Sequence, residues 1–322
     1  MSTMTRKVVQ KINWEGRILS ERRDSNPRPL PPQGSALARL RYVPCHSKTR
    51  TNVRIMPSNV KIMYSQKQSN CISAGSAIIV FLLSFLLLAS PCSAQIERAG
   101  QLVFVISPDW SSTTGLMYLF NRTGDGWVQY NIPWKVFLAD SGLAWGIGLH
   151  TIPLGERKKV EGDRRSPAGI FELGDFFGYD SMPPPGIRFP YQHATKALHC
   201  VDDSGSVFYN SLVSENEVKR DSAGKLPWKS SEVMKMDSAY YRYGIIVKHN
   251  PRSIPGKGSC IFLHVVGSDS SATSGCTAMG EANLLFLMQW LDPDMHPLLV
   301  QLPVSAFREY LLEWNLPLLL KN

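Results

Sequence analysis

Short apolar runs separated by turn residues dominate the chain beyond residue 100. Residues 101–107 (QLVFVIS), 115–120 (GLMYLF) and 127–130 (WVQY) are three such runs, and glycines 124 and 126 separate the second from the third. Short runs rich in β-branched and aromatic residues and bounded by glycine are typical of β-strands. The pattern therefore predicts a mainly β domain, either a sandwich or a partly open barrel.

Helical periodicity is confined to the C-terminal part of the chain. Apolar residues recur at helical spacing over residues 279–291, and Pro293 ends that segment. Residues 304–314 are amphipathic at the same spacing and are expected to pack onto the sheet. Short C-terminal helices thus complete an α+β class in which strands dominate. We expect one domain over residues 95–303, followed by a C-terminal helix and tail over residues 304–322.

The N-terminal part of the chain has a different character. Residues 1–62 are rich in arginine and proline and show little apolar periodicity, which predicts a disordered leader that the mature protein need not contain. Residues 63–94 carry an apolar run of 13 residues, 77–89, followed by Pro-Cys-Ser-Ala. The run is shorter than the roughly 20 residues of a membrane span. It predicts a secretory signal peptide cleaved before Gln95, with an uncleaved membrane anchor as the alternative.

The net charge argues against nucleic acid as a partner. The chain carries +9 overall, but residues 1–62 hold 13 basic and 3 acidic side chains, so the remainder has 35 − 13 = 22 basic and 26 − 3 = 23 acidic ones. The basic excess therefore belongs to the leader, and the domain itself is close to neutral. A neutral domain lacks the basic surface that binds phosphate backbones. After signal cleavage, we expect a secreted or periplasmic protein without stable membrane insertion.

Three cysteines, Cys200, Cys260 and Cys276, lie beyond the predicted signal. An odd number in an exported domain predicts one disulfide, which we assign to Cys200 and Cys260, and one free reactive thiol at Cys276. Two reduced, buried thiols are the alternative for the pair. Asn121 begins an Asn-Arg-Thr sequon, a glycosylation candidate in a eukaryotic host.

His264 and Cys276 are the strongest chemical signal. His264 lies in the apolar run 260–267, which predicts a buried strand, and Ser274-Gly275-Cys276 follows as a permissive turn ahead of the predicted helix. A thiol nucleophile needs a neighbouring base, and His264 is suited to that role. The amides of Gly275 to Thr277, at the start of a helix, would bind the oxyanion of a tetrahedral intermediate. A buried histidine and a structural cysteine are the alternative interpretation.

Two motifs in this order resemble the L,D-transpeptidase (YkuD-type) catalytic domain. That family is marked by a Thr/Ser-Pro-x-Gly-x-Phe strand, which residues 166–171 (SPAGIF) fit, and later by a strand ending in His, a loop and Ser-x-Gly-Cys, which His264 and residues 274–276 fit. The resemblance covers roughly residues 101–303. The chain departs from the common Gly-Cys-x-Arg pattern by placing Ala278 where Arg is usual, so that Gly-Cys-Thr-Ala-Met marks a divergent branch.

The resemblance implies an enzyme that acts on peptidoglycan stem peptides. Cys276 would attack an amide carbonyl and form a thioester, with His264 as base, and an incoming amine or water would then complete transpeptidation or hydrolysis. A wall-binding module without activity is an alternative of another class. Ser274, His249 and Asp163 are the substrate-binding candidates. No recognised zinc spacing accompanies His199 and Cys200, so neither a metal nor a cofactor is expected.

Overall fold

The computed structural model describes residues 91–124, 126–267 and 272–319. The predicted leader and nearly all of the predicted signal peptide lie outside these residues. The first described element is helix α2, Pro91–Arg98, which crosses the expected cleavage point before Gln95. Among the described residues, no helix combines the length and the apolar character that a membrane span needs.

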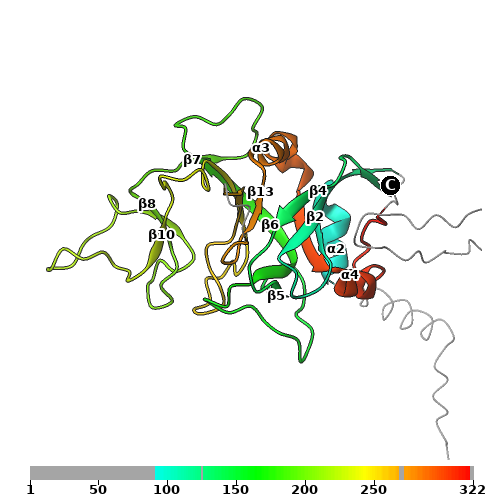
Figure 1. The fold of residues 1–322 in the computed structure, drawn as a ribbon, viewed down its shortest axis with the longest axis horizontal. Helices are drawn as coiled ribbons and strands as arrows, with labels where there is room; N and C mark the ends of the chain where they lie inside the picture. Colours follow the sequence, from blue (N-terminus) through cyan, green and yellow to red (C-terminus); the bar gives the residue numbers. More distant parts are fainter. Residues whose placement is uncertain (1–90, 125, 268–271, 320–322) are drawn as a thin grey trace, which may run out of the picture. The chain divides into compact units, whose positions relative to one another are not determined.

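Eight strands close into a barrel (Figure 1). Their order around the barrel is β1, β14, β6, β11, β12, β13, β4 and β2, and β2 pairs with β1 to complete the ring. The bounds are β1 Gln101–Ser107, β2 Thr114–Thr123, β4 Trp134–Phe137, β6 Ser166–Gly178, β11 Tyr243–Val247, β12 Phe262–Val265, β13 Thr277–Met279 and β14 Leu298–Pro303. Closure removes the unpaired edges that an open sheet would expose.

Three further strands extend the barrel wall. Strand β3, Gly126–Gln129, pairs with β2 as a hairpin, while β5, Leu143–Trp145, and β7, Tyr191–His193, each pair in parallel with β6. The expected strand at residues 101–107 has the predicted bounds, and all seven of its residues are buried. Burial along the whole strand explains why its sequence is continuously apolar rather than alternating.

The helices occupy separate parts of this unit. Helix α3, Glu281–Trp290, buries Leu284, Leu287 and Met288, and helix α4, Val304–Tyr310, follows β14 without a loop. Both lie within the two segments where helical spacing was predicted, and a single 3-10 turn, Pro293–Met295, separates α3 from β14. The mainly β fold class with short C-terminal helices is confirmed.

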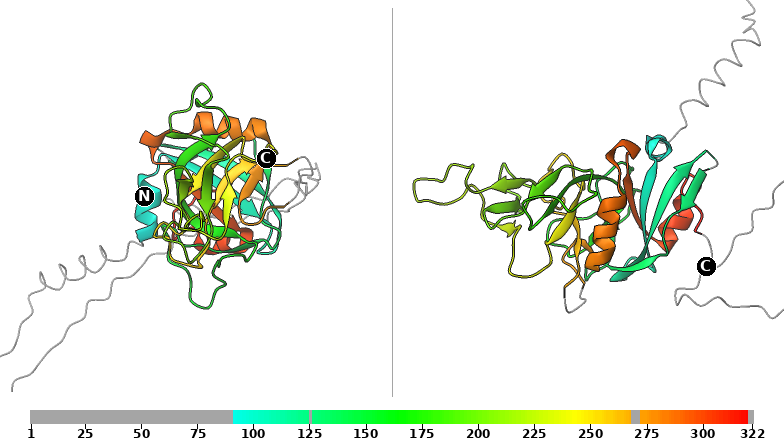
Figure 2. Two further views of the ribbon diagram at one scale, coloured as in Figure 1. Left: turned by 90° about the vertical axis from the view of Figure 1, so that its left-hand side faces the viewer. Right: turned by 90° about the horizontal axis from the view of Figure 1, so that it is seen from above.

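A second, three-stranded sheet forms a separate lobe. Strand β8, Leu198–Val201, lies between β9, Leu212–Ser214, and β10, Ser231–Val233. This sheet lies at the opposite end of the unit from α4, as Figure 1 and the view from above in Figure 2 both show. A disulfide from Cys200 in β8 to Cys260, just before β12, ties the lobe to the barrel.

Candidate active site

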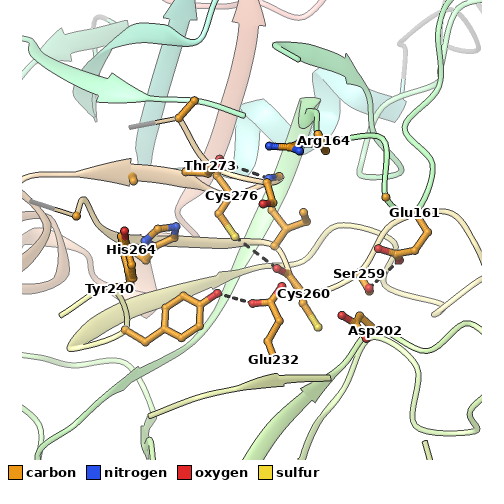
Figure 3. Close-up of a pocket in the computed structure, with 18 of the residues that line it drawn as sticks. Glu161, Arg164, Asp202, Glu232, Tyr240, Ser259, Cys260, His264, Thr273 and Cys276 are labelled. Atoms are coloured by element: carbon orange, nitrogen blue, oxygen red, sulfur yellow. Dashed lines mark hydrogen bonds between the residues drawn. The ribbon is translucent and has the colours of Figure 1, made fainter. Parts of the chain in front are cut away.

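A cavity of about 480 Å³ lies between the barrel and the β8–β10 lobe, and we call it the central cavity. Its lining includes both members of the predicted catalytic pair, His264 and Cys276 (Figure 3). Cationic and anionic side chains also face it from other segments: Lys159, Arg164, Glu161, Asp202 and Glu232. A candidate nucleophile, a candidate base and opposite charges in one cavity are the components of an enzyme site.

The parallel pairing of two short strands positions the predicted nucleophile and the predicted base. Leu263 in β12 is in register with Thr277 in β13, so His264 follows the paired position on one strand and Cys276 precedes it on the other. Each is 7% exposed. The two side chains therefore reach the same cavity from neighbouring strands.

Main-chain groups hold the thiol of Cys276. Its Sγ accepts a hydrogen bond from the amide of Phe262 at 3.2 Å and donates one to the carbonyl oxygen of Cys260 at 3.5 Å. The Cys276 carbonyl in turn accepts from the hydroxyls of Ser166 at 2.8 Å and Thr273 at 2.6 Å. Ser166 is fully buried and begins the Ser-Pro-x-Gly-x-Phe motif. This motif therefore contacts the Ser-x-Gly-Cys motif directly, through the hydrogen bond from Ser166 to the Cys276 carbonyl.

His264 is arranged as a neutral base. Its Nδ1 lies 2.8 Å from the carbonyl oxygen of Val265, and a carbonyl can only accept, so Nδ1 carries the hydrogen. Burial lowers the pKa of His264 to about 4. The hydrogen bond to Val265 raises the pKa, but by less than burial lowers it. The rings of Tyr240 and Tyr241 meet the imidazole edge to face and fix its plane. The remaining nitrogen, Nε2, is therefore unprotonated at neutral pH and able to take a proton.

Burial also dominates the electrostatics of the thiol. The pKa of Cys276 is raised far above its ordinary value, first because a buried thiolate loses hydration and next because of the charge of Glu232. The Phe262 amide and the ammonium of Lys159 act in the opposite direction. Cys276 consequently rests as a thiol, and it would need a base in order to act as a nucleophile.

Comparison with known proteins agrees with this geometry. A family model described as YkuD, L,D-transpeptidase catalytic domain, matches residues 125–301, which is more than half of the chain and includes every side chain of the central cavity. The chain belongs to the L,D-transpeptidase catalytic domain family. The resemblance seen in the two sequence motifs is therefore confirmed, and this domain is a catalytic one.

One solved structure also matches the chain: the helical cell shape determining protein Pgp2 from Campylobacter jejuni. It is 15% identical, with a TM-score of 0.30, and the match covers 65% of this chain and 53% of that one. The chain thus matches about half the length of that protein. No curated protein sequence matched the chain.

Within this L,D-transpeptidase domain, the acidic wall of the central cavity was not predicted from sequence. Glu232, in β10, accepts a hydrogen bond from the hydroxyl of Tyr241. Burial raises the pKa of Glu232 to about 7; the Tyr241 bond lowers it, and the charges of Asp202 and Glu161 raise it further. Asp202 Oδ1 is buried and has no hydrogen-bond partner among the described residues. Asp202 also lines the cavity.

Asp163 does not reach the central cavity as a substrate-binding group. Its carboxylate accepts from Lys159 Nζ at 2.8 Å and from the amides of Val160 and Arg165 at 3.0 Å each. These three donors occupy both of its oxygens within its own loop. Lys159, four residues earlier, is the group that faces the cavity, and the sequence offered only the i,i+4 spacing of a lysine and an aspartate as a signal.

The expected helix start at Gly275–Thr277 is wrong. Residues 277–279 form β13, paired with β12 and β4, and α3 begins only at Glu281. Pairing on both sides holds this buried segment extended, so the N-terminus of α3 does not lie at Gly275–Thr277. The hydroxyl of Thr277 donates to Gln301 at 2.8 Å inside the barrel. Ser274 is exposed on the cavity lining and Gly275 is buried there, and both remain candidates for binding substrate.

His249 lies away from the central cavity, contrary to the preferred expectation. Its Nδ1 accepts from the amide of Ile147 at 3.2 Å, and its Nε2 donates to the carbonyl of Lys257 at 2.9 Å. Burial lowers its pKa to about 4. With both nitrogens engaged, His249 joins two loops beside a smaller cavity of about 210 Å³ that does not contain the thiol.

The remaining candidates have simple placements. The structure joins Cys200 to Cys260 and leaves Cys276 as a free thiol. Asn121 is half-buried in β2, where it is paired with both Gln101 and Val128. Over residues 91–319, leaving out 125 and 268–271, no three histidine, cysteine, aspartate or glutamate side chains are grouped to hold a metal ion.

Proposed function

We propose that the protein is an exported cysteine acyltransferase that acts on peptidoglycan stem peptides. The observation that carries this proposal is a buried thiol and a neutral imidazole that line the same cavity, in a chain of the L,D-transpeptidase catalytic domain family. The predicted signal peptide supports export. A wall-directed substrate and an extracytoplasmic location are consistent with each other.

The first half-reaction forms a thioester. As Cys276 Sγ attacks the carbonyl carbon of the scissile amide, its proton passes to His264 Nε2, giving an imidazolium and a tetrahedral intermediate. The carbon–nitrogen bond then breaks, the imidazolium gives its proton to the leaving amine, and a D-amino acid departs. His264 Nδ1 keeps its hydrogen bond to Val265 throughout, which holds the ring in position.

The second half-reaction returns the thiol. An amine from another stem attacks the thioester, loses its proton to His264 Nε2 and leaves the peptide cross-linked, while the thiolate of Cys276 takes that proton back. Water in place of the amine gives a carboxypeptidase. Hydrolysis is the second candidate function, because Ala278 stands where the common family pattern has an arginine.

Mass spectrometry of the full-length chain tests this proposal. Incubation with muropeptides that carry a tetrapeptide stem should release terminal D-alanine, and the intact protein should gain the mass of the acyl group. The Cys276→Ala variant should do neither. A cross-linked product would identify a transpeptidase and a tripeptide product a hydrolase, whereas binding without any Cys276-dependent product would indicate the wall-binding module.

A further inference from the structure

Lys159 is an ammonium group held inside the protein. Its side chain is only 4% exposed, yet it lines the central cavity. Burying a cation costs several kcal/mol unless it is well paired, and an apolar residue of similar size would avoid that cost. Lys159 has one carboxylate partner, Asp163, at 2.8 Å. An ammonium has three hydrogens to donate, so this ion pair leaves two for another acceptor.

The ammonium lies beside the residue that precedes the nucleophile. A Cβ placed on Gly275 would be 3.7 Å from Lys159 Nζ, and the absence of a side chain there leaves this approach open. In a peptide whose carbonyl is attacked by Cys276, the C-terminal carboxylate of the leaving residue is one residue away from that carbonyl. Gly275 is the chain neighbour of Cys276, so the ammonium beside it lies on the side of the cavity where this carboxylate could be bound.

The charges around the cavity limit where a substrate carboxylate can be bound. Glu161, Asp202 and Glu232 all line the cavity and disfavour a carboxylate beside them, although Glu161 accepts hydrogen bonds from the hydroxyls of Tyr209 and Ser259. Of the two cations that line the cavity, Arg164 is 65% exposed and is paired with Asp140, so Lys159 is the inner one. Ala278, at the position where the family pattern has arginine, is 1% exposed and brings no charge.

We propose that the ammonium of Lys159 binds the C-terminal carboxylate of the donor peptide, at the residue that leaves as a free amino acid. This inference rests on the proposed acyl transfer. Lys159, in the loop before β6, would supply the positive charge that the common family pattern has as an arginine at position 278. Asp163 is then a positioning residue, because it aims the ammonium through the bond at 2.8 Å.

Two donors that differ only in that charge test the assignment. One is a muropeptide with a tetrapeptide stem ending in D-alanine, and the other is the same muropeptide ending in D-alaninamide. We expect the wild-type protein to acylate Cys276 at least about tenfold faster in kcat/KM with the acid, a factor that corresponds to one moderate ionic contact. Lys159→Met should abolish this preference, and Lys159→Arg should keep most of it.

Lys158→Met is the matched control, because Lys158 is the exposed neighbour of the same charge and should leave the preference unchanged. A merely structural role for Lys159 would slow both donors equally and preserve their ratio. Equal rates for the two donors in the wild type would overturn the inference. Because that comparison uses no variant, the inference stays testable even if Lys159→Met folds poorly. Failure of both donors to acylate wild-type Cys276 would instead reject the proposed function.

Discussion

The thiol of Cys276 donates a hydrogen bond to the main-chain carbonyl of Cys260 at 3.5 Å. A group that donates is protonated, and the raised pKa of Cys276, caused first by burial and then by Glu232, agrees with this contact. Cys276, the proposed nucleophile, is thus held as a thiol in the same cavity as a neutral histidine. An ion pair of thiolate and imidazolium is not the resting state.

Alkylation of the Cys276 thiol should therefore be slow in the wild-type protein and faster in the Glu232→Gln variant. Removing the negative charge of Glu232 lowers the pKa of Cys276 and raises its thiolate fraction, by roughly tenfold if the pKa changes by one unit. The measurement is the rate of iodoacetamide modification of Cys276 as a function of pH. Glu217→Gln, an exposed carboxylate in the same lobe, is the control for net charge. Equal rates in all three proteins would show that Glu232 does not act on the thiol.

His264 should support acylation to unusually low pH. Because its pKa is lowered to about 4, the ring stays neutral as the pH falls, and kcat/KM for thioester formation should be halved only near that value. His264→Gln should lower the rate by roughly 10² to 10⁴, which is the usual contribution of a general base. The measurement is the pH profile of D-alanine release. A half-loss close to the ordinary value of 6.5 would contradict the neutral, buried arrangement.

The sequence could predict those parts of the molecule that depend on residues close together in the chain. The strand at 101–107 is apolar at every position, and its burial is complete, so its bounds could be read directly. His264 and Cys276 are separated by one loop and carry a family motif, so their meeting across β12 and β13 could be anticipated. Helix α3 is long enough to show its period.

The parts that were missed depend on contacts between distant segments. Glu232 reaches the cavity from the β8–β10 lobe, and nothing near it in the sequence marks that role. Residues 277–279 are too few to show a strand period, and pairing with β12 and β4 keeps them extended. Asp163 looked available to substrate because the three donors that satisfy it become apparent only in the folded loop.

The disulfide should stabilise both the fold and the site. Cys200 and Cys260 are 60 residues apart, so replacing both by serine should lower the free energy of unfolding by about 2 to 5 kcal/mol. Cys260 also has a left-handed φ of 55°, and its carbonyl contacts the Cys276 thiol. Denaturant unfolding measures the first effect. Acylation of the folded double variant should also slow; an unchanged rate would limit the disulfide to a stabilising role.

Three buried histidines should make the fold sensitive to acid. Burial lowers the pKa of His150, His249 and His264 from 6.5 to about 4, so between these values the unfolded chain binds protons that the folded one does not. Stability is therefore lost as the pH falls from about 6.5 to about 4, by at most about 1.4 kcal/mol per pH unit for each histidine. Glu232, with its pKa raised to about 7, binds a proton in the folded state instead and opposes the trend, one group against three. Urea midpoints measured across this range should decrease toward acid, and His249→Asn should flatten the slope.

Two glycines of the motifs should respond differently to replacement by alanine. Gly169 has a φ of 135°, and a Cβ on it would lie 1.8 Å from Cε1 of the buried His150, so Gly169→Ala should cost several kcal/mol of folding free energy. Gly275 has no left-handed φ, and the nearest contacts of a Cβ there would be ordinary ones: 3.4 Å to Ile261, 3.7 Å to the carbonyl oxygen of Arg165 and 3.7 Å to Lys159 Nζ. Gly275→Ala should therefore fold with nearly unchanged stability. The Gly275→Ala variant should still acylate more slowly, because the added methyl group lies between the ammonium and the space beside Cys276 where the carboxylate is expected.

Thermal unfolding and D-alanine release, measured on both glycine variants, separate the effect on stability from the effect on activity. A Gly275→Ala protein with full activity would show that the substrate does not pass along this side of the cavity.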